Sequence, residues 1–252
     1  MILAKCENVR KEFPIKRGYL QDTIGAVKAV DGVSLTINKG EAFGLVGESG
    51  CGKTTLGRII LGVIKPDAGS VELKTTKLQA VFQDPYNSLD PKMRVCDILA
   101  EGLVLKANVT GRMTPIREKV REALDLVKLP ESALMKFPHQ FSGGERQRIA
   151  IARAIITEPE FIVCDEPVSS LDVTIQLEIL NLLKDFRRKL GITYLFISHD
   201  LRVVKYMCDR LAVMRQGRIV EEGDVDNVYN RPSHPYTKLL LSSILSVGLI
   251  GQ

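Results

Sequence analysis

The sequence predicts an α/β fold with a β-rich N-terminal part, a sheet containing parallel strands, and a helical insertion. Three observations support this prediction. The first third of the chain alternates apolar and polar residues, a glycine-rich loop stands between a short apolar run and a helical pattern, and a strand, helix and strand pattern follows in the second half. With 252 residues, of which 45% are apolar, the chain is long enough for one large domain or for a core with one inserted subdomain.

The first third of the chain is expected to consist mainly of strands. AVKAVDGVSLTI (26–37) alternates as a half-buried strand does, NKGE (38–41) is typical of a turn, and AFGLV (42–46) is typical of a short buried strand. Helical spacing of apolar residues then predicts a helix from Thr54 to about Leu61, ended by Gly62. The order is therefore strand, glycine loop, helix.

The remainder of the chain separates into a helical part and a parallel-sheet part. From about Asp84 to Thr157 helical periodicity replaces the strand signals, which predicts a helical insertion. FIVCDE (161–166) and TYLFISHD (193–200) are apolar runs that end in polar residues, with a helical segment between them, as in a βαβ unit. LAVMRQGRIVEEG (211–223) predicts a closing hairpin with Gln216 and Gly217 at its turn.

The composition excludes several classes of protein. The net charge is +5, but Lys and Arg are spread without runs, so a nucleic-acid partner is not expected. The five cysteines stand far apart without a CxxC pair, which favours a reducing compartment over disulfides or zinc. Charges in the N-terminal MILAKCENVRKEF disfavour a signal peptide. The most apolar stretch, LLLSSILSVGLIG (239–251), is shorter than the roughly 20 residues that span a bilayer.

A phosphate-binding loop is predicted at GESGCGKT (47–54), which fits the pattern G-x-x-x-x-G-K-[ST]. Its glycines let backbone N–H groups wrap phosphates, and the following helix offers its positive end. Lys53 is expected to reach the β and γ phosphates, and the Thr54 hydroxyl to bind magnesium. The alternative is a plain helix entrance. If the loop binds ATP, alkylation of Cys51 is expected to block that binding, and ATP is expected to protect the thiol.

An acidic pair ends the strand predicted at FIVCDE. A buried strand that ends in an acid places a carboxylate at the carboxyl edge of the sheet, where ligands bind in open α/β folds. Asp165 is expected in the shell of the magnesium ion. Glu166 is expected to orient or deprotonate a water for attack on the γ phosphate. The alternative is a strand that simply ends in exposed acids.

A second glycine-rich helix entrance occurs at FSGGERQR (141–148). Ser142 and Glu145 have the spacing of a capping box, so Ser142 is expected to begin a helix. Gly143 and Gly144 leave backbone N–H groups that an anion could approach closely. The alternative is a well-capped helix with no ligand.

Together these motifs resemble those of one family. GESGCGKTT, FQDP, FSGGERQR, FIVCDE, SSLD and ISHD occur in the order and approximate spacing of the ATP-binding subunits of ABC transporters, and the resemblance covers nearly the entire chain. It implies a P-loop NTPase (RecA-like) core with an N-terminal antiparallel β subdomain and an inserted α-helical subdomain. It implies four segments: 1–83 (β subdomain and first part of the ATP-binding core), 84–157 (helical subdomain with the signature motif), 158–230 (remainder of the core) and 231–252 (C-terminal helical segment).

The resemblance also implies an activity and roles for individual residues. The activity is ATP hydrolysis with Mg²⁺, and two ATP molecules would be sandwiched between two subunits, each signature loop FSGGE closing over the partner's ATP. The implied catalytic set is Lys53, Gln83, Glu166 and His199, in which Gln83 senses magnesium and the attacking water and His199 contacts the γ phosphate. The implied metal set is Thr54, Gln83 and Asp165.

The implied nucleotide-binding residues fall in four places in the sequence. Phe13 matches the aromatic that stacks on adenine, although a core phenylalanine remains the alternative, and His199 could otherwise be a histidine at a strand end. Asp172, in SSLD, matches the loop that crosses the dimer interface. The whole implied set is Phe13, Gly47, Glu48, Ser49, Gly50, Cys51, Gly52, Lys53, Thr54, Thr55, Ser142, Gly143, Gly144 and Asp172.

Two features depart from the commonest family pattern. The signature reads FSGGE where LSGGQ is more usual, which puts a carboxylate near a phosphate site. Because repulsion in a dry interface is costly, we expect Glu145 to turn back and cap its own helix. The run from Gly69 to Gln83 is also shorter than usual, which leaves open whether the β subdomain lacks a strand or hairpin there.

A narrower resemblance concerns the C-terminal part. RPSHPYTKLLLSSI (231–244), with FQDPYNSLDPKM and FSGGERQRIAIARA, resembles the importer ATPases for dipeptides, oligopeptides and nickel. It implies a second ATPase subunit, the same or homologous, and separate permease subunits that dock at PYNSLDPKM (85–93). It also implies an indirect link to a substrate-binding protein, and a peripheral location on the cytoplasmic face of the membrane. No iron–sulfur site is expected.

Two other functions remain as alternatives. One is a soluble ABC ATPase acting on nucleic acid or ribosomes. The other is a non-hydrolysing regulator, against which the presence of Glu166 and His199 argues. The sequence does not name the cargo.

Overall fold

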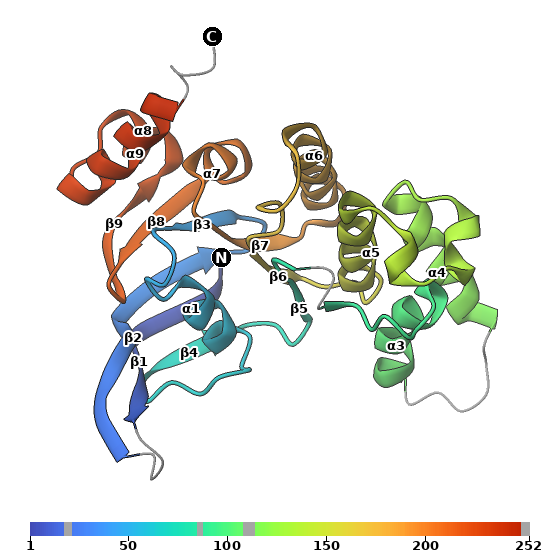
Figure 1. Cartoon of the computed structure of the whole chain (residues 1–252), viewed down its shortest axis with the longest axis horizontal. Helices are drawn as coiled ribbons and strands as arrows, with labels where there is room; N and C mark the ends of the chain where they lie inside the picture. The colour runs from blue at the N-terminus through green and yellow to red at the C-terminus, as the bar shows by residue number, and fades with distance from the viewer. Residues whose placement is uncertain (18–21, 85–87, 108–113, 248–252) are drawn as a thin grey trace. The chain divides into compact units, whose positions relative to one another are not determined.

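The computed structural model describes residues 1–17, 22–84, 88–107 and 114–247 (Figure 1). The chain divides into two compact units: Met1–Thr76 with Thr193–Gln252, and Lys77–Ile192. Each unit is described separately below.

An antiparallel sheet forms the N-terminal part of the first unit. The strands β1 (Ile2–Arg17), β2 (Asp22–Asn38) and β4 (Ala68–Leu73) pair in the order β2-β1-β4. Both pairs in this sheet are antiparallel, and the ladder of β1 and β2 contains several bulges. The predicted β-rich start is confirmed.

Parallel strands form the rest of the first unit. β3 (Ala42–Val46) lies between β7 (Thr193–Ser198) and β8 (Arg210–Arg215) and is parallel to both (Figure 1). Every residue of β3 and β7 is buried, as expected for strands covered on both faces. β9 (Arg218–Asp224) pairs antiparallel with β8. The predicted hairpin turn is present, and its residues Gln216 and Gly217 both have positive φ, as the twist of a two-residue turn requires.

Among the described residues of the first unit, four segments are α-helical. α1 (Lys53–Ile60) follows β3 and begins within the predicted phosphate loop. Gly62, with φ of 74°, ends this segment in the left-handed conformation. The other helices are α7 (Leu201–Met207), α8 (Val225–Asn230) and α9 (Pro235–Val247). The predicted helix after the glycine loop is therefore confirmed within one residue at its start.

The second unit, as described, contains the parallel strand pair of β5 and β6 and a run of helices. β5 (Leu78–Val81) pairs parallel with β6 (Phe161–Asp165). The helices α3 (Val95–Ala107), α4 (Thr114–Leu126) and α5 (Gly143–Ile155) pack against one another, and α6 (Val173–Leu190) packs on α5 (Figure 1). Short 3₁₀ segments, η1 (Glu131–Met135) and η2 (Pro138–Gln140), lead into α5.

The predicted fold class is confirmed, since antiparallel strands, parallel strands and a run of helices occur in the expected order. β4 and β5 are separated only by residues 74–77, which explains the short segment noted in the sequence. Over the ranges that the structure describes, no helix combines the length and the hydropathy needed to cross a membrane. The division into four segments stays a prediction.

Candidate functional site

Two glycines of the phosphate loop lie so close to backbone atoms of other segments that a side chain would not fit. A Cβ atom on Gly47 would lie 2.1 Å from the carbonyl oxygen of Met214, at the end of β8. A Cβ atom on Gly52, whose φ is 111°, would lie 1.9 Å from the carbonyl oxygen of Ala29. Any side chain at either position would displace the loop, so local packing alone requires these two glycines.

Lys53 lies inside the curve of this loop. The side chain is only 4% exposed, and its ammonium group donates hydrogen bonds to the carbonyl oxygens of Gly47 (2.7 Å) and Glu48 (2.8 Å). The positive charge is thus already held among the loop's backbone groups. The lysine side chain would therefore not have to be ordered when a phosphate binds.

The entrance of α1 is open to an anion. As described, the helix has no side-chain cap at Gly52, and its first turn carries no acidic residue. The first N–H groups of a helix need partners, and this end of the helix is positive. An uncapped helix entrance with a buried lysine has the chemistry that a phosphate site requires. Thr54 and Thr55 lie half-buried in the same first turn.

Two neighbouring segments hold the loop from behind. The backbone N–H of Gly217, in the β8–β9 turn, donates to the carbonyl oxygen of Cys51 at 2.9 Å. The backbone N–H of Glu48 donates to the hydroxyl oxygen of Tyr236, in α9, at 3.1 Å. The sequence assigned no role to Tyr236, whose stretch RPSHPYTK carried a family resemblance but no chemistry.

The Cys51 thiol is buried, which changes what alkylation should show. It is 8% exposed, and burial raises its pKa, although the nearby charge of Lys53 opposes that effect. Because the thiolate is the nucleophile, we expect iodoacetamide to modify Cys51 slowly at neutral pH and faster as the pH rises. Mass spectrometry of the loop peptide, with and without ATP and with a Cys51→Ser control, checks this. Rapid modification at neutral pH would contradict the buried placement.

His199 and the loop share one edge of the parallel sheet. Val46 is in register with Ser198, so the residues that follow, Gly47 and His199, both leave the sheet at the carboxyl ends of neighbouring strands. His199 is exposed there. The topology therefore brings His199 to the edge where the phosphate loop begins.

Phe13 is not a core residue. It lies on β1 opposite Val27 and is 40% exposed, and the Lys11 ammonium lies 5.7 Å from the centre of its ring. The exposure removes the alternative of a core phenylalanine. An exposed ring on a rigid strand is available for stacking on a flat ligand.

The two acids after β6 differ in their surroundings. Asp165 is 8% exposed at the end of the strand. Glu166 is half-buried, and its backbone has φ of 49°, which is unusual for a residue with a side chain. The backbone carbonyl oxygen of Glu166 accepts two hydrogen bonds from Ser169, one from its N–H at 3.3 Å and one from its hydroxyl at 3.2 Å. Because Asp165 is buried and Glu166 is half-buried, a strand with exposed acids does not describe this pair.

Gln83 follows β5 at the edge of the second unit's strand pair where β6 ends in the two acids. Val81 is in register with Cys164, so Gln83 and the acid pair both follow the carboxyl ends of neighbouring parallel strands. Gln83 is exposed. Of the predicted permease-docking segment 85–93, residues 85–87 lie outside the described residues. The carbonyl oxygen of Ser88 accepts a hydrogen bond from the Arg153 guanidinium.

The signature loop FSGGE caps its own helix, as predicted. The Ser142 hydroxyl oxygen accepts the N–H of Glu145 at 3.3 Å. A Glu145 carboxylate oxygen accepts both the N–H and the hydroxyl of Ser142 at 2.8 Å. These bonds from Ser142 are the main cause that lowers the pKa of Glu145. The carboxylate therefore points back at Ser142, and the two glycine-rich helix entrances differ, since that of α5 is capped and that of α1 is not.

Gly144 and Asp172 each have a structural role at the start of α6: Gly144 packs against it, and Asp172 caps it. A Cβ atom on Gly144 would lie 2.5 Å from a methyl carbon of Ile175, whereas Gly143 has more room. Asp172 caps α6 by accepting the N–H of Ile175 at 3.0 Å. Arg148 on α5 also pairs with Glu178 on α6 at 2.6 Å. The start of α5 is thus tied closely to the start of α6.

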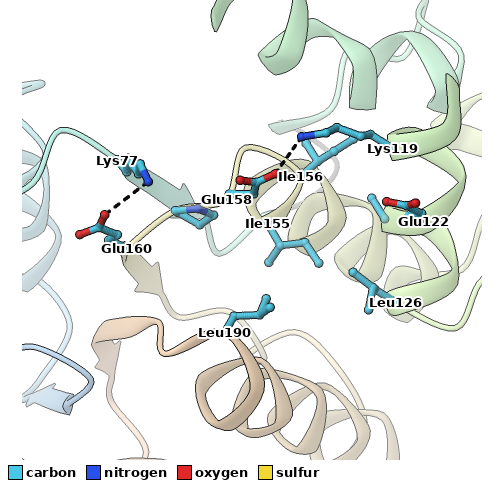
Figure 2. Close-up of a pocket in the computed structure, with 11 residues that line it drawn as sticks. Lys77, Lys119, Glu122, Leu126, Ile155, Ile156, Glu158, Glu160 and Leu190 are labelled. Carbon is cyan, nitrogen blue, oxygen red and sulfur yellow. Dashed lines mark hydrogen bonds and ion pairs between the residues drawn. The ribbon is translucent and has the colours of Figure 1, made fainter. Parts of the chain in front are cut away.

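A separate pocket of the second unit contains none of the predicted site residues. It has a volume of about 370 Å³, and Leu126, Ile155 and Leu190 line its apolar part (Figure 2). Charged residues at its edge pair with one another, Lys119 with Glu158 at 2.8 Å and Lys77 with Glu160 at 3.4 Å (Figure 2). An apolar hollow with paired charges does not suit a polyphosphate.

Comparison with known proteins identifies the family of the chain. The family described as "ABC transporter" matches residues 30–169, and the family "Oligopeptide/dipeptide transporter, C-terminal region" matches residues 220–248. The oligopeptide transport ATP-binding protein OppF of Bacillus subtilis is 47% identical over 236 residues, covering 87% of this chain and 77% of OppF. The dimeric, post-hydrolysis structure of the ATP-binding cassette MJ0796 bound to ADP and Pi matches with a TM-score of 0.77 at 28% identity, covering 88% of this chain and 99% of that one. The cassette cbiO1 of Clostridium perfringens, part of the transporter complex cbiONQ, matches with a TM-score of 0.76 at 28% identity, covering 98% of each chain.

The fold and the phosphate loop define a class of protein, the ATP-binding cassettes. This chain belongs to the ABC transporter family, as an ATP-binding protein of the oligopeptide/dipeptide import branch. It is an ABC-type ATPase coupled to transport, as the motif order predicted.

Proposed function

We propose that this chain hydrolyses ATP to power the uptake of peptides, or of nickel or a related small solute, through separate permease subunits. The observation that carries the proposal is the uncapped entrance of α1 with Lys53 buried in it, followed along the chain by a C-terminal region of the oligopeptide/dipeptide type. Relatives such as OppF are named for oligopeptide transport, which favours peptides.

ATP binding rests on the phosphate loop and Phe13. Lys53 would exchange its bonds with the carbonyl groups of Gly47 and Glu48 for bonds with the β and γ phosphates, and the N–H groups of the loop would hold the rest. The exposed ring of Phe13 would stack on adenine. Thr54, Gln83 and Asp165 offer oxygen atoms, the donors that Mg²⁺ prefers, and would hold it with substrate phosphates. Bound Mg²⁺ would neutralise part of the phosphate charge.

Hydrolysis rests on Glu166, Gln83 and His199. Glu166 would orient and deprotonate the attacking water, Gln83 would contact the same water, and His199 would donate a hydrogen bond to the γ phosphate. The left-handed backbone of Glu166 aims this side chain differently from that of Asp165, so that the two acids can have separate tasks. The chemistry is phosphoryl transfer to water by positioning and electrostatics.

The signature loop would act on the partner subunit's ATP. Ser142, Gly143 and Gly144 would contact its γ phosphate, and Asp172 would lie at the subunit interface. Ser142 would have to turn its hydroxyl from Glu145 toward that phosphate, since its hydrogen bond now goes to the carboxylate. The partner is a second ATPase subunit, the same or homologous. Dimers of related cassettes support this arrangement.

The permease would be a separate membrane protein. The described part of the docking segment, 88–93, precedes α3 and would contact permease loops. ATP binding would close the dimer and drive the permease outward-facing, and hydrolysis would reset it. The chain would therefore lie peripherally on the cytoplasmic face of the membrane, with an indirect link to a substrate-binding protein. The rival proposal is an ABC ATPase that acts on nucleic acid or ribosomes.

Uptake of a labelled oligopeptide by cells that lack this chain tests the proposal. Wild-type chain is expected to restore uptake, whereas Lys53→Ala is expected not to, because the phosphate loop loses its charge. Uptake that does not depend on the chain, together with nucleic acid copurifying with it, would favour the rival.

Replacing Glu145 by Gln is expected to change ATP hydrolysis by no more than about threefold. Glutamine can form the same capping box, and the carboxylate points at Ser142 rather than away from its helix. Steady-state hydrolysis by the purified chain checks this, with Glu145→Ala as the comparison that removes the cap. A sharp acceleration in Glu145→Gln would mean that the carboxylate repels the partner's ATP.

A further inference from the structure

The C-terminal segment is hydrogen-bonded to a carboxylate of the sheet. Glu221 on β9 accepts the N–H of Ser233 (2.7 Å), the hydroxyl of Ser233 (2.8 Å) and the N–H of His234 (3.0 Å). Burial opposes the charge, but the hydrogen bonds from Ser233 and His234 lower the pKa of Glu221 to about 2. The anchor therefore stays ionised throughout the physiological range.

Tyr236 follows this anchor in the first turn of α9. Its N–H donates to the Nδ1 atom of His234 at 3.2 Å, and Pro235 begins the helix. The side chain is 3% exposed, and the Arg215 guanidinium, at the end of β8, lies 4.7 Å from the centre of its ring. A buried ring with a fixed backbone and a cation over its face has little freedom to move.

The Tyr236 hydroxyl reaches one particular peptide group of the phosphate loop. It accepts the N–H of Glu48, whereas the carbonyl oxygen of the same peptide group, that of Gly47, accepts the Lys53 ammonium. Both polar atoms of the Gly47–Glu48 peptide are thus bonded, one to α9 and the other to Lys53. Hydrogen bonds at the two ends of one peptide polarise and orient it together.

We infer that Tyr236 is a positioning residue for ATP binding, through which the C-terminal segment sets the orientation of the phosphate loop. The inference deepens the proposed function and rests on it. Lys53 must release the Gly47 carbonyl group when phosphate arrives, and the bond to Tyr236 then keeps the peptide from turning. The loop meets the phosphates already ordered, so the ordering entropy is not lost at binding.

Tyr236→Phe tests the inference, since it keeps the ring under Arg215 and removes only the hydroxyl. We expect the dissociation constant of a fluorescent ATP analogue with Mg²⁺ to rise about threefold to tenfold, the value of one hydrogen bond. The KM for ATP should rise by the same factor while kcat stays close to that of the wild type. Tyr229→Phe is the matched control, because Tyr229 also lies under a cation, Lys205 at 4.1 Å. Glu221→Ala, which frees the anchor, should shift affinity in the same direction as Tyr236→Phe.

Each result for these variants either supports or overturns the inference. Weaker binding in Tyr236→Phe and Glu221→Ala, with Tyr229→Phe unchanged, supports the inference. Equal affinity in Tyr236→Phe and wild type overturns it, and so does a lower melting temperature with unchanged affinity, which would make the hydroxyl structural only. A wild-type chain that fails to bind the analogue at all would overturn the proposed function, and the inference with it.

Discussion

Glu166→Gln is expected to lower ATP hydrolysis by at least about a hundredfold while leaving ATP binding intact. The amide keeps the size of the side chain but cannot accept the proton of the attacking water. The fold should not suffer, since the carbonyl group that holds the turn at Glu166 belongs to the backbone. Hydrolysis and analogue binding by the purified chain check both statements.

Glu158→Gln offers a matched control, because Glu158 is also a glutamate with positive φ in the second unit, but it pairs with Lys119. Its hydrolysis should equal that of the wild type. The solution mass of Glu166→Gln should then be compared with ATP and with ADP. A dimer seen only with ATP supports the action of the signature on a partner's nucleotide and self-pairing. A monomer with both nucleotides points to a different ATPase subunit as the partner, or to a signature that does not work in trans.

Gly52→Ala is expected to abolish measurable ATP binding, weakening it by about a hundredfold or more. The added methyl group would meet the Ala29 carbonyl oxygen at 1.9 Å, and the left-handed backbone disfavours any Cβ atom. The two effects together amount to about 3 kcal/mol or more, which the loop can relieve only by moving. Analogue titration and thermal melting measure the loss.

Gly62→Ala separates crowding from backbone strain. Gly62 follows the other end of α1 and also has positive φ, of 74°, but nothing lies within 4 Å of where its Cβ atom would be. We expect this variant to lose about 1 kcal/mol of stability and to keep its affinity for ATP. Equal loss of affinity in both variants would show that strain in α1, and not the contact with Ala29, governs the loop.

Local patterns predicted the elements and the local bonds of the site. The capping box of Ser142 and Glu145 follows from a spacing of three residues, and it is present. The turn at Gln216 and Gly217 follows from the polar stretch RQGR between two apolar runs. In both cases the interacting groups are near in sequence, so that backbone geometry alone decides the contact.

Contacts between distant segments were not predictable. The bond from Glu48 to Tyr236 joins residues that are 188 positions apart, and no periodicity reports it. The resemblance left open whether Phe13 stacks on adenine or lies in the core, and its exposure on β1 had to come from the structure. Gly144 was expected to serve an anion, whereas the structure also gives it a packing role against Ile175.

Gly144 packs closely on Ile175, and Arg148 forms an ion pair with Glu178, so the N-terminal halves of α5 and α6 are held together. Under the proposed function, the loop that enters α6 carries the base for the subunit's own ATP, and the loop that enters α5 contacts the ATP of its partner. One helix pair therefore spans two nucleotides. Movement of that helix pair would therefore link the two ATP sites of the dimer.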